Sequence, residues 1–244
     1  MTTKKGVKLI LDVNLLVGAL YSITKDGEEK NEFEEGFNKV GLLKELFEEK
    51  YGVHTKIIVR ERDLERAYEI LKGSKEYSSK LSQEKIKVLE KYLSKRKFSG
   101  DENGYSISIN GINIYVVRSN KEDRYVEELY KKHPEYVKIV EGLKKNRYID
   151  GGDVDLMKFV IAFSAKHNGK NYYILLTLDE RILKERTNIC RVLNKENKIF
   201  ISTPENLLYS LKIDKGDYKN LEESLRLNSI IYFFNSENKN KKNK

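Results

Sequence analysis

The sequence is poor in the residues that mark disulfide-bonded or zinc-binding proteins. It contains one cysteine, Cys190, three histidines and no tryptophan among 244 residues. A single cysteine excludes an intramolecular disulfide and every multi-cysteine zinc site, and three scattered histidines leave little for a zinc centre. If the protein uses a metal ion, we therefore expect carboxylate ligands.

Long apolar runs are also missing. No segment approaches the roughly 18 consecutive apolar residues of a membrane span, and the N-terminus, MTTKKGVKLILDVN, enters a strand pattern without an apolar signal core. We therefore expect a cytoplasmic protein without membrane association. Hydrophobic residues make up 39% of the chain and charged residues 35%, with two prolines, which is typical of a helix-rich globular protein.

Basic residues are in excess, with 47 Lys and Arg against 38 Asp and Glu and a formal net charge of +9. A basic surface attracts polyanions because binding releases their condensed counterions. Nucleic acid is the partner that this balance favours. For the charge alone, genome bias or general solubility is an equally good explanation.

Short apolar strands alternate with amphipathic helices in the first and last parts of the chain. The expected strands cover residues 7–11, 56–59, 172–177 and 199–201, and the main expected helices cover about 34–50, 60–72, 153–168 and 204–211. This alternation predicts an α/β fold with a mostly parallel central sheet and helices on both faces.

Residues 74–147 interrupt the alternation. They contain two alternating strands joined by Asn110-Gly111, the pair typical of a two-residue type I′ hairpin, and helices are expected at about 82–97, 121–132 and 134–146. We expect this segment to form an inserted lobe outside the catalytic sheet, which grips the substrate or docks a protein partner.

The remaining segments define the other expected domains. Residues 1–73 and 148–214 would form the catalytic domain. Residues 215–244 would form a C-terminal helix/strand extension that ends in a basic, disordered tail, SENKNKKNK.

Acidic residues gather where the expected strands end. Asp12 directly follows the first strand, and Asp179 lies just beyond the strand at 172–177. Asp153 and Asp155 open a helix, and Glu65 lies near the start of the helix after the second strand. Ligand sites of parallel sheets form beyond the carboxyl ends of the strands.

Carboxylates crowded at neighbouring strand ends would repel one another and raise each other's pKa, which is costly unless a cation neutralises them. Mg²⁺ or Mn²⁺ prefers such oxygen ligands. Each acidic residue taken singly has an ordinary explanation as a helix cap or a strand-end residue. The combination, not any single residue, predicts the metal site.

Three segments, in order along the chain, resemble the PIN-domain nuclease family. LILDVNLLVGAL (9–20) combines an apolar strand with Asp, Asn and a helix start. DVDLMKFVIAFSAKHNGKNYYILLTLDERIL (153–183) combines an acidic helix start, an apolar strand and Thr-x-Asp, and IFISTPENLL (199–208) adds a strand and Thr-Pro-x-x-Leu. The inserted segment has no counterpart in the minimal fold of this family.

The resemblance implies an acidic quartet with two supporting polar residues. Its members would be Asp12, a Glu of the 61–69 helix, Asp155 or Asp153, and Asp179, supported by Asn14 and Thr177. Among Glu61, Glu65 and Glu69 we choose Glu65 for its distance from the strand, and Asp153 stays an alternative to Asp155.

The activity implied by the resemblance is hydrolysis of a phosphodiester in RNA, assisted by one or two Mg²⁺ or Mn²⁺ ions. One alternative is a PIN-like protein that binds nucleic acid or regulates without catalysing. Another is a structure-specific DNA nuclease with similar acidic chemistry.

Aromatic and basic residues lie side by side between residues 105 and 125, as on a single-strand binding surface. We expect Arg118, Lys121 and Arg124 to contact nucleic acid, with single-stranded RNA as the ligand. Ordinary packing is the simpler alternative for each tyrosine in this segment. A protein partner at the inserted lobe and a homodimer are further alternatives.

Overall fold

The fold is built on one six-stranded sheet. The structure is a computed structural model, and it describes residues 6–25, 32–74, 77, 81–134, 136, 141–142, 149–166, 171–184, 198–213, 221 and 225. The expected helix at 134–146 lies mostly outside these residues, and so does nearly all of the expected C-terminal extension.

The strands are β1 (Val7–Leu11), β2 (Thr55–Arg60), β3 (Gly104–Ile109), β4 (Ile112–Val117), β5 (Tyr172–Leu176) and β6 (Ile199–Ser202). They are arranged in the order β3-β4-β2-β1-β5-β6. All neighbouring pairs are parallel except β3 and β4. The predicted α/β class with a mostly parallel sheet is confirmed.

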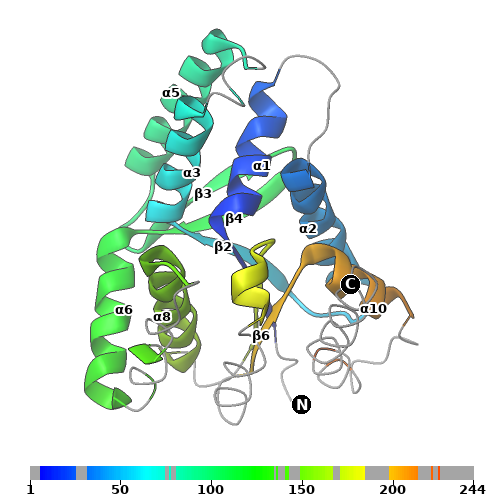
Figure 1. Cartoon of the computed structure of the whole chain (residues 1–244), viewed down its shortest axis with the longest axis vertical. Coiled ribbons are helices and arrows are strands. Elements are labelled where there is room, and N and C mark those ends of the chain that lie inside the picture. Colours follow the sequence, from blue (N-terminus) through cyan, green and yellow to red (C-terminus); the bar gives the residue numbers. More distant parts are fainter. Residues whose placement is uncertain are drawn as a thin grey trace, which may run out of the picture.

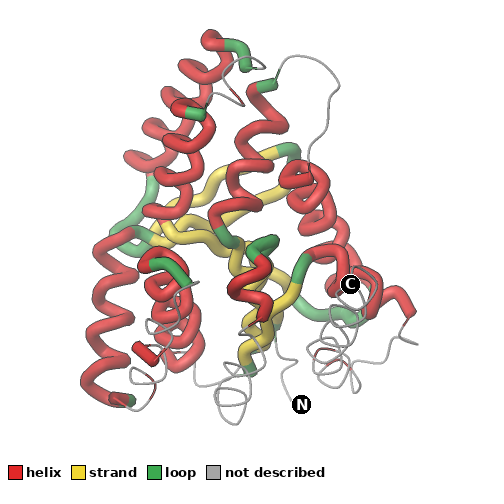
Figure 2. The backbone as a smooth tube through the Cα atoms, in the orientation of Figure 1, coloured by secondary structure: helices red, strands yellow, loops and turns green. Residues whose placement is uncertain are grey.

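Helices cover both faces of this sheet (Figures 1 and 2). One face carries α1 (Val13–Thr24), α2 (Glu32–Glu49), α3 (Glu61–Gly73), α5 (Gln83–Ser99) and α10 (Pro204–Ile213). The other face carries α6 (Ser119–Lys132) and α8 (Gly151–Lys166). None of the described helices combines the length and the apolarity needed to cross a membrane.

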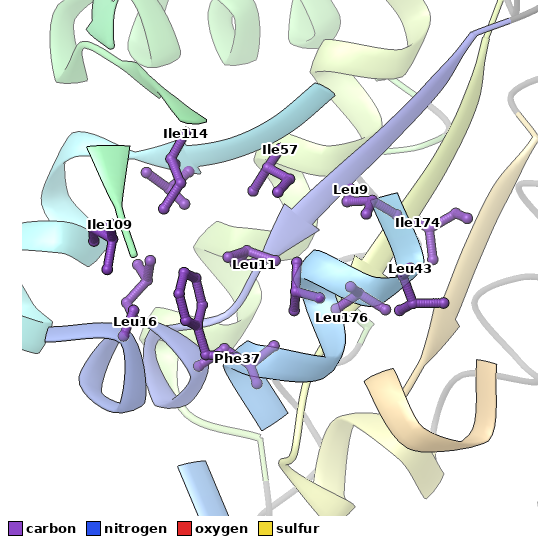
Figure 3. Close-up of a cluster of buried hydrophobic side chains, with 14 of the residues drawn as sticks. Leu9, Leu11, Leu16, Phe37, Leu43, Ile57, Ile109, Ile114, Ile174 and Leu176 are labelled. Atoms are coloured by element: carbon purple, nitrogen blue, oxygen red, sulfur yellow. The ribbon is translucent and has the colours of Figure 1, made fainter. Parts of the chain in front are cut away.

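The strands of the sheet centre are buried on both faces. Leu9 and Leu11 of β1 point into the cluster under α1 and α2, which Figure 3 shows, whereas Ile10 points into the cluster under α8. A strand covered on both sides has no polar face, which explains why these segments read as continuous apolar runs.

The hairpin turns as the sequence predicts. Asn110 has φ 50° and Gly111 has φ 77°, the two positive values that a type I′ turn requires. Glycine adopts this conformation without strain, and asparagine is one of the few other residues that tolerate it.

The position of the hairpin differs from the prediction. β4 pairs in parallel with β2, with Ile114 opposite Ile57, so the hairpin extends the central sheet, and the expectation that it stands outside that sheet is wrong. Ile107, Ile109 and Ile114 are buried in the same core cluster as β1 and β2. Because a lone hairpin is marginal in water, this burial gives the hairpin the cover that it needs.

The edge strand β3 is closed by a side chain of α5. The Tyr92 hydroxyl accepts a hydrogen bond from the backbone N–H of Ser108 at 3.0 Å and donates one to the carbonyl of the same residue at 3.5 Å. The Arg96 guanidinium lies over the Tyr92 ring, 5.4 Å from its centroid. The backbone groups of Ser108 are therefore satisfied without another strand.

Candidate active site

The connections of the sheet change face between β1 and β5. The two strands are parallel neighbours, yet α1 after β1 packs in one core cluster, whereas Ile182 and Leu183 after β5 pack in the other. Such a switch point leaves a crevice outside the carboxyl ends of the two strands, and ligands of parallel sheets bind there. Asp12 and Asp179 follow these two strands.

Asp12 is the N-cap of α1 and is 4% exposed. One carboxylate oxygen accepts a hydrogen bond from the Val13 N–H at 2.6 Å, and the other accepts one from the Thr177 hydroxyl at 2.7 Å. Both donors are neutral, and among the described residues Asp12 makes no ion pair. The helix cap therefore orients the side chain and leaves its charge uncompensated.

The pKa of Asp12 is raised to about 6. Burial is the largest cause, because it penalises the ionised form, and the charges of Asp63 and Asp153 raise the pKa further. The hydrogen bonds from Thr177 and Val13 act in the opposite direction. Asp12 therefore interacts electrostatically with two further carboxylates, one from α3 and one from α8.

Asp63 takes the place that the sequence analysis gave to Glu65. Asp63 is 4% exposed in the first turn of α3, whereas the Glu65 side chain is 57% exposed and pairs with Lys97 at 2.7 Å. The structure therefore does not bring Glu65 together with Asp12, and Asp63 is the residue of α3 that it brings there. A step of two positions turns a helix by about 200°, more than half a turn, so Asp63 and Glu65 cannot both face the sheet edge.

A signal for Asp63 was present in the sequence. Asp63, Ala67 and Leu71 recur at four-residue spacing, and all three are buried. That spacing places them on one face of a helix. Distance from the strand was the wrong criterion, because the phase of the helix decides which side chain turns inward.

Arg60, at the end of β2, already compensates the charge of Asp63. Its guanidinium holds both carboxylate oxygens of Asp63 and also donates to Glu122 of α6 at 3.1 Å. Arg60 is 3% exposed and Glu122 is 2% exposed. Burial is also the largest cause that raises the pKa of Glu122, to about 7. This buried cluster ties β2, α3 and α6 together.

Asp153, and not Asp155, faces the cluster. Asp153 is 8% exposed, and the Asp155 side chain is 52% exposed and lies 3.8 Å from Lys158. The backbone N–H of Asp153 donates to Asp150 at 2.9 Å, and the N–H of Asp150 donates back to Asp153 at 3.3 Å. This reciprocal arrangement resembles a capping box and fixes Asp153 at the start of α8.

The pKa of Asp153 is raised, first by burial and then by the charge of Asp150, with Asp179 adding to the effect. Asp179 itself shows the opposite shift. Its pKa is lowered, chiefly by hydrogen bonds from the Arg181 guanidinium, which donates to both of its oxygens. The same guanidinium lies 3.8 Å from Asp153, so Arg181 bridges two acidic residues.

The two supporting residues differ in what they do. The Thr177 hydroxyl donates to Asp12 and accepts from the backbone N–H of Asp179 at 2.9 Å, so it links the ends of β1 and β5. Thr177 is fully buried, which fixes this link. Asn14 is half-buried in the first turn of α1.

The acidic residues are therefore brought to one edge, but they do not converge as a closed ligand shell. Within the part of the chain that the structure describes, no three candidate ligands lie close enough to hold an ion together. Asp12 suits a hard cation best, because it is a buried carboxylate without an ion pair to a described residue, and the buried Asp153 is only weakly compensated, by Arg181 at 3.8 Å. Asp63 and Asp179 are occupied by arginines.

The three residues expected to contact nucleic acid have different environments. Arg118 donates to the carbonyls of Lys97 and Asp101 and lies over the Tyr105 ring, 5.4 Å from its centroid. These contacts join the end of α5 to the hairpin and give Arg118 a structural role, and its contact with nucleic acid stays a prediction. Lys121 lies over the Tyr125 ring at 5.6 Å, and Arg124 is exposed.

Comparison of the chain with protein-family models, with curated proteins and with solved structures finds no match.

Proposed function

We propose that the chain is a metal-dependent ribonuclease with a PIN-like catalytic core. The observation that carries the proposal is the buried Asp12 carboxylate at the switch point of the sheet, whose pKa is raised to about 6 and whose nearest acidic neighbours come from α3 and α8. A buried carboxylate without a cation is costly, and perturbed pKa values of this kind cluster at functional sites.

Asp12 and Asp153 are the residues that would hold Mg²⁺ or Mn²⁺. When bound, such an ion supplies a water of lowered pKa and positive charge for the phosphate. Asp63 and Asp179 can join only by giving up Arg60 and Arg181, respectively.

The protein contributes orientation and electrostatics around these ligands. Thr177 and the Val13 N–H fix the Asp12 carboxylate, and Asp150 fixes Asp153. The N-termini of α1 and α8 lie beside these carboxylates, and the positive ends of helix dipoles favour a phosphate. Arg181, between Asp153 and Asp179, is placed to exchange a carboxylate for a substrate phosphate.

RNA is proposed over DNA because the motifs at 9–20, 153–183 and 199–208 resemble PIN-domain nucleases. The same oligonucleotide sequence in RNA and in DNA separates the two substrates. Preferential cleavage of the DNA, especially at a branched junction, would favour the structure-specific DNA nuclease instead.

Cleavage of single-stranded RNA in Mg²⁺, in Mn²⁺ and in EDTA tests the proposal. We expect cutting only with a divalent ion. Asp12→Asn should lower the rate by well over about 100-fold, because even partners that merely orient metal ligands are worth that much. Full cleavage in EDTA, or by Asp12→Asn, would overturn the mechanism.

A nucleic-acid-binding protein without catalytic activity is the second candidate. It is favoured by the arginines at Asp63 and Asp179, because guanidinium groups there already take the place of an external cation. Calorimetry with Mn²⁺ separates the two candidates. Binding of RNA without binding of Mn²⁺ and without cleavage would select the second.

A further inference from the structure

The outward face of α5 combines basic residues with exposed apolar ones. Ile86 and Leu89 turn the opposite face of the helix into the core. Phe98, in the last turn, is 88% exposed, and Val88 is 63% exposed. Phe98 is the most exposed large hydrophobic residue that the structure describes.

Three lysines share this outward face with Phe98. Lys87, Lys91 and Lys95 are exposed, and none of them makes an ion pair with a described residue. Their four-residue spacing corresponds to about 6 Å per step along the helix axis, close to the spacing of successive phosphates along an extended strand. Glu84 is the one acidic residue that the helical phase places among them. The face is therefore a positive stripe that ends in an aromatic ring.

The aromatic end of this stripe lies at the acidic edge of the sheet. Lys97, next to Phe98, is 3.4 Å from Glu61, which lies two residues before Asp63 in α3. The carbonyl of Lys97 also accepts a hydrogen bond from Arg118, at the start of α6. Figure 1 shows α5 running alongside α3 to that edge.

We propose that the outward face of α5 binds single-stranded RNA, with one unpaired base stacked on Phe98 and the backbone phosphates along Lys91 and Lys95. Stacking on an aromatic ring together with lysine–phosphate contacts is the chemistry by which proteins hold single strands. The stacked base must be unpaired, so duplex RNA is not the ligand. This inference rests on the proposed function, because it leads the strand toward the acidic edge.

The absence of tryptophan from the chain provides a direct reporter. Phe98→Trp creates a single indole that should be quenched when a base stacks on it. The probe is a short oligoadenylate RNA in EDTA, so that binding is measured without cleavage. Tyr209→Trp, at an exposed position of α10 (69% exposed), is the matched control.

We expect quenching at position 98 and little at position 209. An abasic strand of equal length should bind through its phosphates and quench much less. If fluorescence anisotropy shows that the oligoadenylate binds while Phe98→Trp is unquenched, or quenched no more than Tyr209→Trp, the proposal is overturned.

A pair of charge variants tests the phosphate contacts separately. Lys91→Ala with Lys95→Ala should weaken binding about tenfold and lower the salt slope by about 1.4, since a single strand contributes about 0.7 per phosphate contact. Lys131→Ala with Lys132→Ala removes the same charge from exposed positions of α6 and should change neither quantity by more than a small fraction. Equal effects of the two pairs of substitutions would show only a general attraction between the basic protein and the RNA, and would overturn the proposal.

The outcomes distinguish this proposal from that of nuclease activity. If RNA binds to α5 but is never cut, the proposed nuclease activity is refuted and the proposed RNA-binding face is retained. Metal-dependent cleavage that is unaffected in rate and affinity by Phe98→Ala would refute the binding face and keep the activity.

Discussion

Two neighbouring strands, β1 and β2, are followed by aspartates that are equally buried and electrostatically different. Asp12 after β1 and Asp63 after β2 are both 4% exposed. Arg60 grips both oxygens of Asp63, whereas Asp12 meets only the neutral donors of Val13 and Thr177. The chain supplies a cation for one carboxylate and none for the other, and the second is the better candidate for binding an external ion.

The largest expected effect comes from removing the internal cation. Arg60→Met should destabilise the protein by about 3–5 kcal/mol, because it leaves Asp63 as a buried charge and takes from Glu122 one of its two arginine partners. Urea unfolding at neutral pH measures the loss. Arg66→Met, in the helix that follows Arg60, is the control, since Arg66 is 52% exposed and 3.8 Å from Asp150, and it should cost less than about 1 kcal/mol. Equal losses would show that Arg60 contributes no more than a surface ion pair.

Asp12→Asn should have the opposite sign. At pH 7 the ionised Asp12 is unfavourable in the folded state, because its pKa lies at about 6 and its reference value is 3.8. We expect the metal-free protein to gain about 1–3 kcal/mol, at about 1.4 kcal/mol per pKa unit. The asparagine carbonyl oxygen still caps the helix at the Val13 N–H, and its NH2 group donates to the Thr177 hydroxyl in place of the bond that Asp12 accepts there. A loss of stability in urea unfolding would instead show that the ionised Asp12 stabilises the folded state as a helix cap by more than its burial costs.

The pH dependence of stability should sharpen the same comparison. Because its pKa is raised, Asp12 holds a proton in the folded state at pH values where the unfolded chain has lost it. The contribution of Asp12 to the free energy of unfolding therefore falls as pH rises from about 4 to about 6. Above that window the contribution is constant. The stability difference between the parent and Asp12→Asn, measured in metal-free urea titrations across this range, should follow that curve. A flat difference would contradict the raised pKa.

Arg181 should compete with a bound cation. Its guanidinium holds Asp179 and lies near Asp153, so Arg181→Ala should tighten Mn²⁺ binding about fivefold, or about 1 kcal/mol, as expected for a partly exposed ion pair. Calorimetry at low ionic strength measures this change, with Lys184→Ala as a control that removes an exposed charge from the same turn. Weaker Mn²⁺ binding in Arg181→Ala would mean that Arg181 organises the ligands and does not compete.

The smallest effects are expected at the two acidic residues that face away from the cluster. Glu65→Gln and Asp155→Asn should cut RNA within about twofold of the parent, because both side chains are more than half exposed and paired with lysines. Cleavage rates at saturating Mg²⁺ test this expectation. A loss comparable to that of Asp12→Asn would return these residues to the proposed site.

Much of the sheet could be predicted because its strands are short apolar runs with clear ends. The strands at 7–11 and 172–176, and the turn at Asn110-Gly111, follow from local composition alone. Asp12 and Asp179 follow from the rule that parallel strands end at one edge, whereas the sequence left Asp153 and Asp155 as alternatives at the start of their helix. These are properties of single segments.

What the sequence did not reveal depends on contacts between segments. Asp63 was missed because the inward face of α3 is set by its packing. The role of Arg60 was missed because one of its partners, Glu122, lies far along the chain from it. The hairpin was assigned to a separate lobe because its alternation predicts pairing within itself, while its parallel pairing with β2 involves distant residues. Burial of Ile107 and Ile114 decides that position.

The hydroxyl of Tyr92 has a consequence beyond the packing of α5. A bare edge strand is a template on which another chain can add a strand, and such addition leads to fibres or exchanged segments. At Ser108 both backbone groups are already engaged by Tyr92, so an incoming strand would have to displace an aromatic side chain before it could pair with this residue. A single phenol thus opposes growth of the sheet into a neighbouring molecule at this point of the edge.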